Sequence, residues 1–153
     1  MKMGENSPVK LYLLHHADAV GPHIDPQRPL SEAGMAHAQA LATRAKAAGC
    51  APAAIWHSGK LRARQTAEAF LRTCGPFAEF KMVRGLLPDD PPQHARDLAT
   101  GETRDVLLAG HMPNLRDVLR TLLPTTAELP LHGVVALETL DEGATWIEQW
   151  REQ

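Results

Sequence analysis

Residues 11–19 read Leu-Tyr-Leu-Leu-His-His-Ala-Asp-Ala, an apolar run that stops at two adjacent histidines and a carboxylate. Such a run is typical of a buried strand, and α/β sheets bind ligands beyond the carboxyl ends of their strands. An imidazole there can act as a nucleophile, a base or a metal ligand. His15 and His16 are therefore candidate functional residues, although a histidine at a strand end is more often structural. Asp18 is a candidate for proton transfer, for orienting His16 or for capping a turn.

Two later segments repeat the pattern of an apolar run, a polar turn and a helix. Ser58-Gly59 follows one run, and Gly110-His111 follows another. The turn at Ser58 would aim unpaired backbone N–H groups and the positive end of a helix dipole at one point, which suits a phosphate or a carboxylate. Arg62 adds a planar guanidinium there, whereas Arg64 faces another side of the helix and is expected to be a surface charge. Ser58, Arg62 and His111 are thus candidate anion ligands.

The hydrophobic spacing predicts an α/β fold with a mostly parallel central sheet and a C-terminal hairpin. Ser31 is the expected N-cap of the first helix and Gly49 its stop. Pro113 is expected in the first turn of the last helix. The other expected elements are a stripe of Met35, Ala38, Leu41, Ala42 and Ala45 in the first helix, strands at 53–57, 80–83 and 105–109, helices after 58 and at 93–99, and hairpin strands at 133–138 and 144–150.

Composition narrows the function classes. At 153 residues the chain is about one domain long, with an expected disordered lead-in at 1–8 and a single domain at 9–153. A formal net charge of −2 offers no general attraction for a polyanion, so we expect no nucleic-acid binding. No apolar run approaches the roughly 20 residues of a membrane span, and the lead-in lacks a signal-peptide core. We therefore expect no membrane partner and a cytoplasmic location.

Cofactor chemistry has little support in the sequence. The two cysteines, Cys50 and Cys74, have no metal-binding spacing and are expected to be free thiols. The eight histidines are scattered without a His-x-x-x-His pair, so a metal site is only a minor alternative. There is no carboxylate cluster for Mg²⁺ and no phosphate-binding Gly-rich loop of the P-loop type. We expect no cofactor.

Two loops offer further candidates. Residues 20–29 are rich in proline, glycine and polar side chains and are expected to pass over the end of the first strand, which makes Arg28 a candidate anion contact. The proline-stiffened loop at 86–92 carries Asp89 and Asp90. Either acid could serve a site, and Asp89 is a candidate for proton transfer, but turn formation and N-capping of the next helix are the more common roles.

Four segments resemble the motifs of the histidine phosphatase superfamily, the phosphoglycerate-mutase-like fold, and most closely its small SixA-type phosphohistidine phosphatases. Residues 11–19 resemble the Arg-His-Gly or Arg-His-Ala motif, and residues 28–34 are similar to Arg-Pro-Leu-Thr-x-x-Gly. Residues 58–67 resemble Ser-Pro-x-x-Arg-Ala-x-Gln-Thr-Ala, and residues 110–113 resemble Gly-His-Asn-Pro. The order of the motifs also matches, and the resemblance covers almost the whole chain.

The resemblance implies a three-layer α/β/α sandwich. It implies that His16 is the phospho-accepting nucleophile, that Arg62 and His111 bind the phosphoryl group, and that Arg28 is a rim contact. The chain departs from the pattern at His15, where the family has arginine. A histidine is charged only in part near neutral pH, so we expect His15 to bind phosphate in a pH-dependent manner.

The expected function is a cofactor-independent phosphatase with a phosphohistidine intermediate. Its substrate would be phosphohistidine in a partner protein or a small phosphorylated molecule. Two alternatives remain. The first is a catalytically weakened module of the same fold that binds a phosphate or a phosphoprotein, and the second is a His-rich metal-binding protein.

Overall fold

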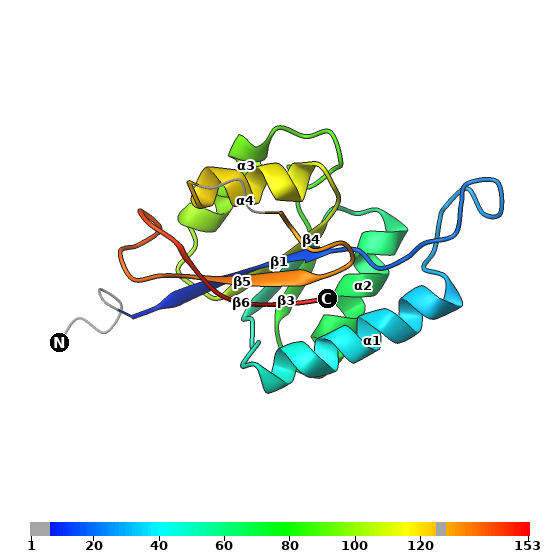
Figure 1. Ribbon diagram of the computed structural model, residues 1–153, viewed down its shortest axis with the longest axis horizontal. Helices are drawn as coiled ribbons and strands as arrows, with labels where there is room; N and C mark the ends of the chain where they lie inside the picture. The colour runs from blue at the N-terminus through cyan, green and yellow to red at the C-terminus, as the bar shows by residue number, and fades with distance from the viewer. Residues whose placement is uncertain (1–6, 125–127) are drawn as a thin grey trace.

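A computed structural model describes residues 7–124 and 128–153 of the chain. One six-stranded sheet runs through the centre, with two helices against each of its faces (Figure 1). The elements in chain order are β1 (Val9–His15), α1 (Glu32–Ala47), β2 (Ala54–His57), α2 (Leu61–Cys74), β3 (Glu79–Met82), α3 (Pro92–Thr100), β4 (Val106–Gly110), α4 (Asn114–Leu122), β5 (Val134–Thr139) and β6 (Ile147–Glu152).

The strand order is β3-β2-β4-β1-β5-β6. Strands β1 to β4 pair in parallel, whereas β5 pairs antiparallel with β1 and with β6. The expected mostly parallel sheet with a C-terminal hairpin is therefore confirmed. This order brings the carboxyl ends of β1, β2 and β4 side by side, and because β5 is antiparallel, its start lies at the same edge.

The two faces of the sheet form two separate cores. Tyr12 and Leu14 of β1 belong to the core under α1 and α2, whereas Leu11 and Leu13 belong to the core under α3 and α4. This alternation follows from the strand period of two, and it explains why a strand covered on both faces reads as a continuous apolar run. The three-layer α/β/α arrangement is confirmed (Figure 1).

The start of α1 is fixed by the residues that follow β1. Ser31 caps the helix as expected, because its Oγ accepts a 3.0 Å hydrogen bond from the Gly34 N–H. Gly34 is buried, and a Cβ there would collide with the carbonyl oxygen of Asp18. Met35 was expected on the buried stripe, which was wrong: it is 45% exposed, and the buried neighbour is Gly34, which packs on the Asp18 backbone.

Other differences from the sequence expectations are small shifts. Pro113 precedes α4 as its N-cap instead of lying in its first turn. The N-cap of α3 is Pro91, and neither Asp89 nor Asp90 caps that helix. Of the expected lead-in at 1–8, residues 1–6 lie outside the described part of the chain, and Ser7 and Pro8 precede β1 without regular structure. Among the described residues, no helix has the length and apolarity needed to cross a bilayer.

Candidate active site

Four histidines meet where β1 and β4 end and β5 begins. His15 is the buried last residue of β1 and His16 follows it, His111 follows β4, and His132 stands two residues before β5. The ring centroid of His16 lies 4.6 Å from that of His15, 5.1 Å from that of His111 and 6.0 Å from that of His132. The sheet topology therefore gathers imidazoles from three distant parts of the sequence.

His16 has a defined tautomer. Its Nδ1–H donates a 2.7 Å hydrogen bond to the carbonyl oxygen of Ala17, which leaves Nε2 without a proton in the neutral ring. Burial, together with the charge of Arg62, lowers the pKa of His16 to about 4, although the bond to Ala17 acts in the opposite direction. His16 is therefore neutral near pH 7 and presents an unprotonated Nε2.

His15 is buried, and its ring stacks on that of His132 at a centroid distance of 5.0 Å. The backbone N–H of His132 donates a 2.8 Å hydrogen bond to His15 Nδ1, so the neutral ring carries its proton on Nε2. Burial lowers the pKa of His15 to about 3, and His16 and His132 add to the effect. The expectation that His15 is partly charged near neutrality is wrong for the free protein, because charging it would break the bond to His132.

His111 is almost fully buried, and its Nε2 shares a 2.7 Å hydrogen bond with Ser58 Oγ. Its Nδ1 is buried and has no hydrogen-bond partner in the described part of the chain. Burial and the nearby His16 and Arg62 lower the pKa of His111 to about 3. If Ser58 donates its hydroxyl proton to Nε2, the Nδ1–H becomes an unpaired donor beside His16.

Arg62, in the first turn of α2, supplies a second unpaired donor. Its Nε is buried and has no partner among the described residues. Thr66 ties this turn to β1: its hydroxyl donates to the Arg62 carbonyl at 2.7 Å and accepts the Ala17 N–H at 3.0 Å. Buried donors normally have partners. Two buried donors without hydrogen-bond partners lie near His16. This arrangement fits a site in which a bound oxyanion would accept both hydrogen bonds.

Arg28 and Lys60 add positive charge around the histidines. Arg28 has a left-handed backbone (φ 50°), and its Nε donates a 3.0 Å hydrogen bond to the Val20 carbonyl. Burial, together with the charge of Arg28, lowers the pKa of Arg62 from its usual value. After burial, Arg28 also contributes to the low pKa of His16, and Lys60 to that of His111. Arg64 lies apart from this cluster, as expected, and pairs with Glu68 on the surface. The candidate site therefore has a positive potential, which favours anions.

Comparison with known proteins agrees with this geometry. The model of the histidine phosphatase superfamily (branch 1) matches residues 12–86, which include both His15-His16 and Arg62. The chain belongs to the histidine phosphatase superfamily. This membership supports a phosphatase activity. No match was found among curated proteins.

Solved histidine phosphatases share the fold. A protein assigned as the phosphohistidine phosphatase SixA of Agrobacterium tumefaciens is 24% identical, with 96% of this chain and 99% of that one covered at a TM-score of 0.79. The protein histidine phosphatase SixA complexed with tungstate is 21% identical, with 95% and 97% covered at 0.80. A phosphoglycerate mutase of Plasmodium falciparum is 18% identical, with 95% and 91% covered at 0.71.

The two acids considered for proton transfer have different surroundings in this histidine phosphatase. The carboxylate of Asp18 accepts a 2.7 Å hydrogen bond from the Ser31 hydroxyl at the start of α1, which favours its structural role. Asp89 is exposed and lines a hollow of about 400 Å³ together with Lys60 and Arg62. Asp90 instead closes a turn, where its Oδ2 accepts the Leu87 N–H at 2.9 Å.

The turn at Ser58 differs from its expected form. Its backbone N–H groups were expected to be free, but Gly59 donates to His57 Nδ1 at 3.0 Å and Lys60 donates to Ser58 Oγ at 3.2 Å. Gly59 has a φ of 93°, which lets the chain turn back on these two side chains. The N–H groups of Gly59 and Lys60 are therefore taken, whereas those of Leu61 and Arg62 at the start of α2 have no hydrogen-bond partner in the described part of the chain.

His132 was missed by the sequence analysis. Its Nδ1–H donates a 2.6 Å hydrogen bond to the His16 carbonyl, and its backbone is left-handed with a φ of 53°. The available signal was its position before the apolar run at 134–137. If that run is recognised as antiparallel to the first strand, the residues that precede it must lie at the first strand's carboxyl end.

The histidines also form a candidate metal cluster. One ligand atom from each of His15, His16 and His132 lies within 4.8 Å of the others. The histidines are scattered in the sequence, but the fold brings these three together. Two of the three rings offer an Nε2 lone pair, but His15 does not, because its Nδ1 already accepts the His132 N–H. A metal bound by all three rings would have to displace that bond.

Proposed function

We propose that this chain is a cofactor-independent phosphatase that forms a phosphohistidine at His16. The observation that carries the proposal is the 2.7 Å bond from His16 Nδ1 to the Ala17 carbonyl. It leaves the Nε2 lone pair of His16 free, and the neighbouring His111 and Arg62 each have a buried nitrogen without a partner in the described part of the chain. A nucleophile held in one tautomer by a backbone acceptor needs no separate base, because the ring is already neutral at pH 7.

In the first step the Nε2 lone pair attacks phosphorus while the bond from phosphorus to the leaving group breaks. Arg62 and His111 would pair with the phosphoryl oxygens, and the neutral His15 would add its Nε2–H as a donor. In the second step water attacks phosphorus and the bond from phosphorus to Nε2 breaks. Inorganic phosphate leaves with the protons of the water, and neutral His16 is regenerated. The Ala17 carbonyl holds the Nδ1–H in both steps and so stabilises the positive charge that the phosphorylated ring develops.

The leaving group requires a proton. Asp89 is our candidate donor for an alcohol, because it is exposed and lines the same hollow as Arg62. A protonated imidazole leaves more readily, so phosphohistidine in a partner protein would need less help from an acid. We propose phosphohistidine or a small phosphorylated molecule as substrate, and the cytoplasm as location. The single-domain organisation over residues 9–153 belongs to the same proposal.

One experiment tests this function. The purified protein and His16→Ala are incubated with a phosphorylated histidine-containing domain, phosphoramidate and p-nitrophenyl phosphate, each with and without a chelator. We expect chelator-independent release of phosphate by the wild type and at least a ~10³-fold loss in the variant. Release that the chelator abolishes, or that survives in His16→Ala, contradicts the proposal. Tight phosphate binding without turnover would favour the weakened binding module, which the replacement of the family arginine by His15 motivates.

The histidine cluster favours metal binding as the second candidate function. His16 and His132 can ligate through Nε2, and both are neutral when their Nδ1 atoms donate. Elemental analysis of the purified protein, followed by Zn²⁺ titration of the wild type and of His132→Ala, separates the two functions. Stoichiometric metal that is lost in His132→Ala would support the metal-binding function over the phosphatase.

A further inference from the structure

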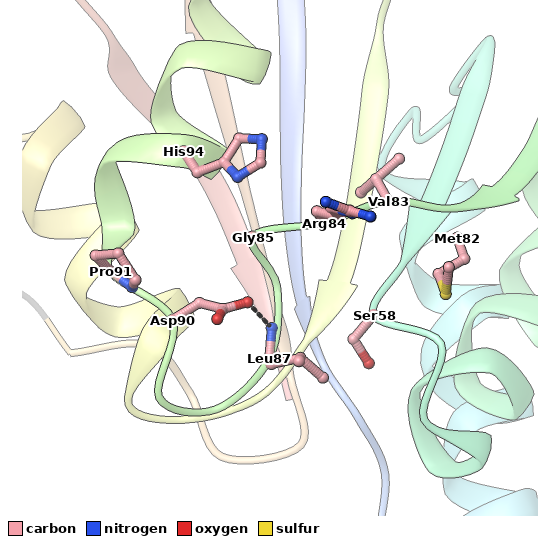
Figure 2. Close-up of a pocket in the computed structure, with 9 residues that line it drawn as sticks. All are labelled: Ser58, Met82, Val83, Arg84, Gly85, Leu87, Asp90, Pro91 and His94. Carbon is pink, nitrogen blue, oxygen red and sulfur yellow. Dashed lines mark hydrogen bonds between the residues drawn. The ribbon is translucent and has the colours of Figure 1, made fainter.

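A pocket of about 500 Å³ lies between the end of β2 and the segment that connects β3 to α3. Figure 2 shows its lining, with Ser58 and Leu87 toward one end and Arg84 and His94 toward the other. Small-molecule sites commonly have volumes of roughly 300–1,000 Å³. The pocket is therefore large enough for a small organic group, and nothing in the proposed chemistry above uses it.

The pocket shares lining residues with the surroundings of the candidate active site. Ser58 lines it and also bonds to His111 at 2.7 Å. Leu87 and Asp90 line both this pocket and the hollow that contains Arg62. In phosphoryl transfer the leaving group stands roughly in line with the nucleophile and on the far side of phosphorus. A phosphoryl group between His16 and Arg62 would therefore direct its leaving group toward the rim formed by residues 87–90.

Hydrogen bonds hold the wall of the pocket in place. The buried Asn114 donates through Nδ2 to the carbonyls of Gly85 at 3.2 Å and Asp90 at 2.9 Å. Asp90 and Leu87 are joined by two further hydrogen bonds, of 2.9 and 3.1 Å. Gly85 has a φ of 96°, and a Cβ there would lie 2.9 Å from the His94 ring. A pre-formed wall of this kind lowers the cost of ordering the site when a ligand binds.

The chemistry of the lining indicates what would fill it. Met82, Val83 and Leu87 supply apolar surface. The guanidinium of Arg84 makes no hydrogen bond or ion pair with any other described residue. Asp90 is the lining acid, and one of its oxygens is already bonded to the Leu87 N–H. The pocket thus offers an apolar wall and one unpaired permanent cation, which match an apolar group that carries a carboxylate.

We propose that this pocket is the leaving-group subsite and that it selects small phosphorylated compounds whose leaving group joins an apolar body to a carboxylate, with Arg84 as the carboxylate ligand. The inference rests on the proposed function only for the position of the phosphoryl group. It favours the small-molecule class over a protein substrate. His94 forms the opposite wall at the start of α3.

Binding of two non-hydrolysable phosphonates tests the subsite without requiring turnover. The pair is benzylphosphonate and 4-carboxybenzylphosphonate, measured by calorimetry with the wild type, Arg84→Ala, Arg84→Lys and Arg96→Ala. Arg96 is the matched control, because it lies on α3 but pairs with Asp97 outside the pocket lining. We expect the wild type and the control to prefer the carboxylated compound by about tenfold, the effect of one charge-assisted hydrogen bond. Arg84→Ala should reduce this preference to near unity, and Arg84→Lys should retain part of it.

Equal affinities in the wild type, or a preference that persists in Arg84→Ala, would overturn the subsite. Turnover of the corresponding aryl phosphates is then assayed with and without the His16→Ala change. If the binding preference holds but no phosphate is released, the proposed function fails and the subsite stands. If phosphate is released in a His16-dependent manner without a preference, the subsite fails and the function stands.

Discussion

The backbone N–H of His132 donates a 2.8 Å hydrogen bond to Nδ1 of His15, a residue 117 positions earlier in the chain. The bond fixes the neutral tautomer of His15, in which Nε2 carries the proton. His15 stands where the motif it resembles has an arginine, yet in the free protein it is neutral and its Nδ1 accepts a hydrogen bond. This hydrogen bond therefore changes the pH dependence that is expected for phosphate binding.

Phosphate inhibition should not reveal a titration of His15 between about pH 6 and pH 8, because its pKa is near 3 in the free protein and charging it would break the bond to His132. His15→Gln keeps a neutral donor and an acceptor for the His132 N–H. The pH dependence of the inhibition constant should therefore run parallel in the wild type and in this variant. If the phosphate affinity of the wild type falls more steeply toward alkaline pH than that of His15→Gln, His15 is charged in the complex.

The sequence predicted the elements that carry strong hydrophobic periodicity. The run at 11–14 and the runs before Ser58 and His111 became neighbouring strands of one sheet, and their polar ends met. Motif order was sufficient to identify the family, because His16 and His111 directly follow two of these strands and Arg62 lies in the first turn of the helix after the third. The weaker predictions concerned residues whose burial depends on tertiary contacts. Met35 is exposed, whereas the adjacent Gly34 packs closely on the Asp18 backbone.

Two features could not be predicted from local sequence. The role of His132 depends on the antiparallel pairing of β5 with β1, which a linear reading does not specify. The low pKa values of His15 and His111 arise mainly from burial, and burial is a property of the assembled sheet and loops. The pairing of the Gly59 N–H with His57 likewise appears only when the turn is built.

Arg62→Ala should weaken transition-state stabilisation by about 2–4 kcal/mol, because it removes an unpaired buried donor beside His16. Arg62→Lys should recover little, since a point charge does not reproduce the planar fork. Arg64→Ala is the control, because Arg64 is exposed and pairs with Glu68. Measured kcat/KM values for the three variants check the assignment, and a comparable loss in Arg64→Ala would transfer the role to that residue.

Thr66→Val should destabilise the fold by about 1–3 kcal/mol, because the buried Ala17 N–H would lose its acceptor. The same change frees the Arg62 carbonyl, so the first turn of α2 should also position Arg62 less well. Thr66→Ser keeps the hydroxyl and is the matched control. Urea unfolding measures the stability, and KM for a phosphorylated substrate measures the effect on Arg62. Wild-type stability in Thr66→Val would show that the bond to Ala17 is unimportant.

Acid should destabilise the folded state from about pH 6.5 downward, because an unfolded histidine has a pKa near that value. In the folded protein the pKa values of His15 and His111 are about 3 and that of His16 is about 4. At pH values between the folded and the unfolded pKa of a histidine, the unfolded protein binds the proton and the folded protein does not. Each such histidine can therefore lower the free energy of unfolding by up to about 1.4 kcal/mol for each pH unit of acidification.

Urea unfolding of the wild type and of His111→Gln between about pH 7 and pH 5 measures this effect. The variant lacks one of the titrating groups, so its stability should fall less steeply over the same interval. Equal slopes would mean that His111 is protonated in the folded protein, in conflict with its burial beside Arg62.

The central claim is that His16 carries the phosphoryl group, and trapping the intermediate tests it most directly. The wild type, His16→Ala and His132→Ala are mixed with phosphoramidate, quenched rapidly in alkali, and analysed by intact mass and peptide mapping. The account predicts one added phosphoryl group on His16 of the wild type, stable in alkali and lost in acid, and none in His16→Ala. A phosphoryl group on another residue, or phosphate release by the wild type without any labelled protein in the presteady state, would contradict it.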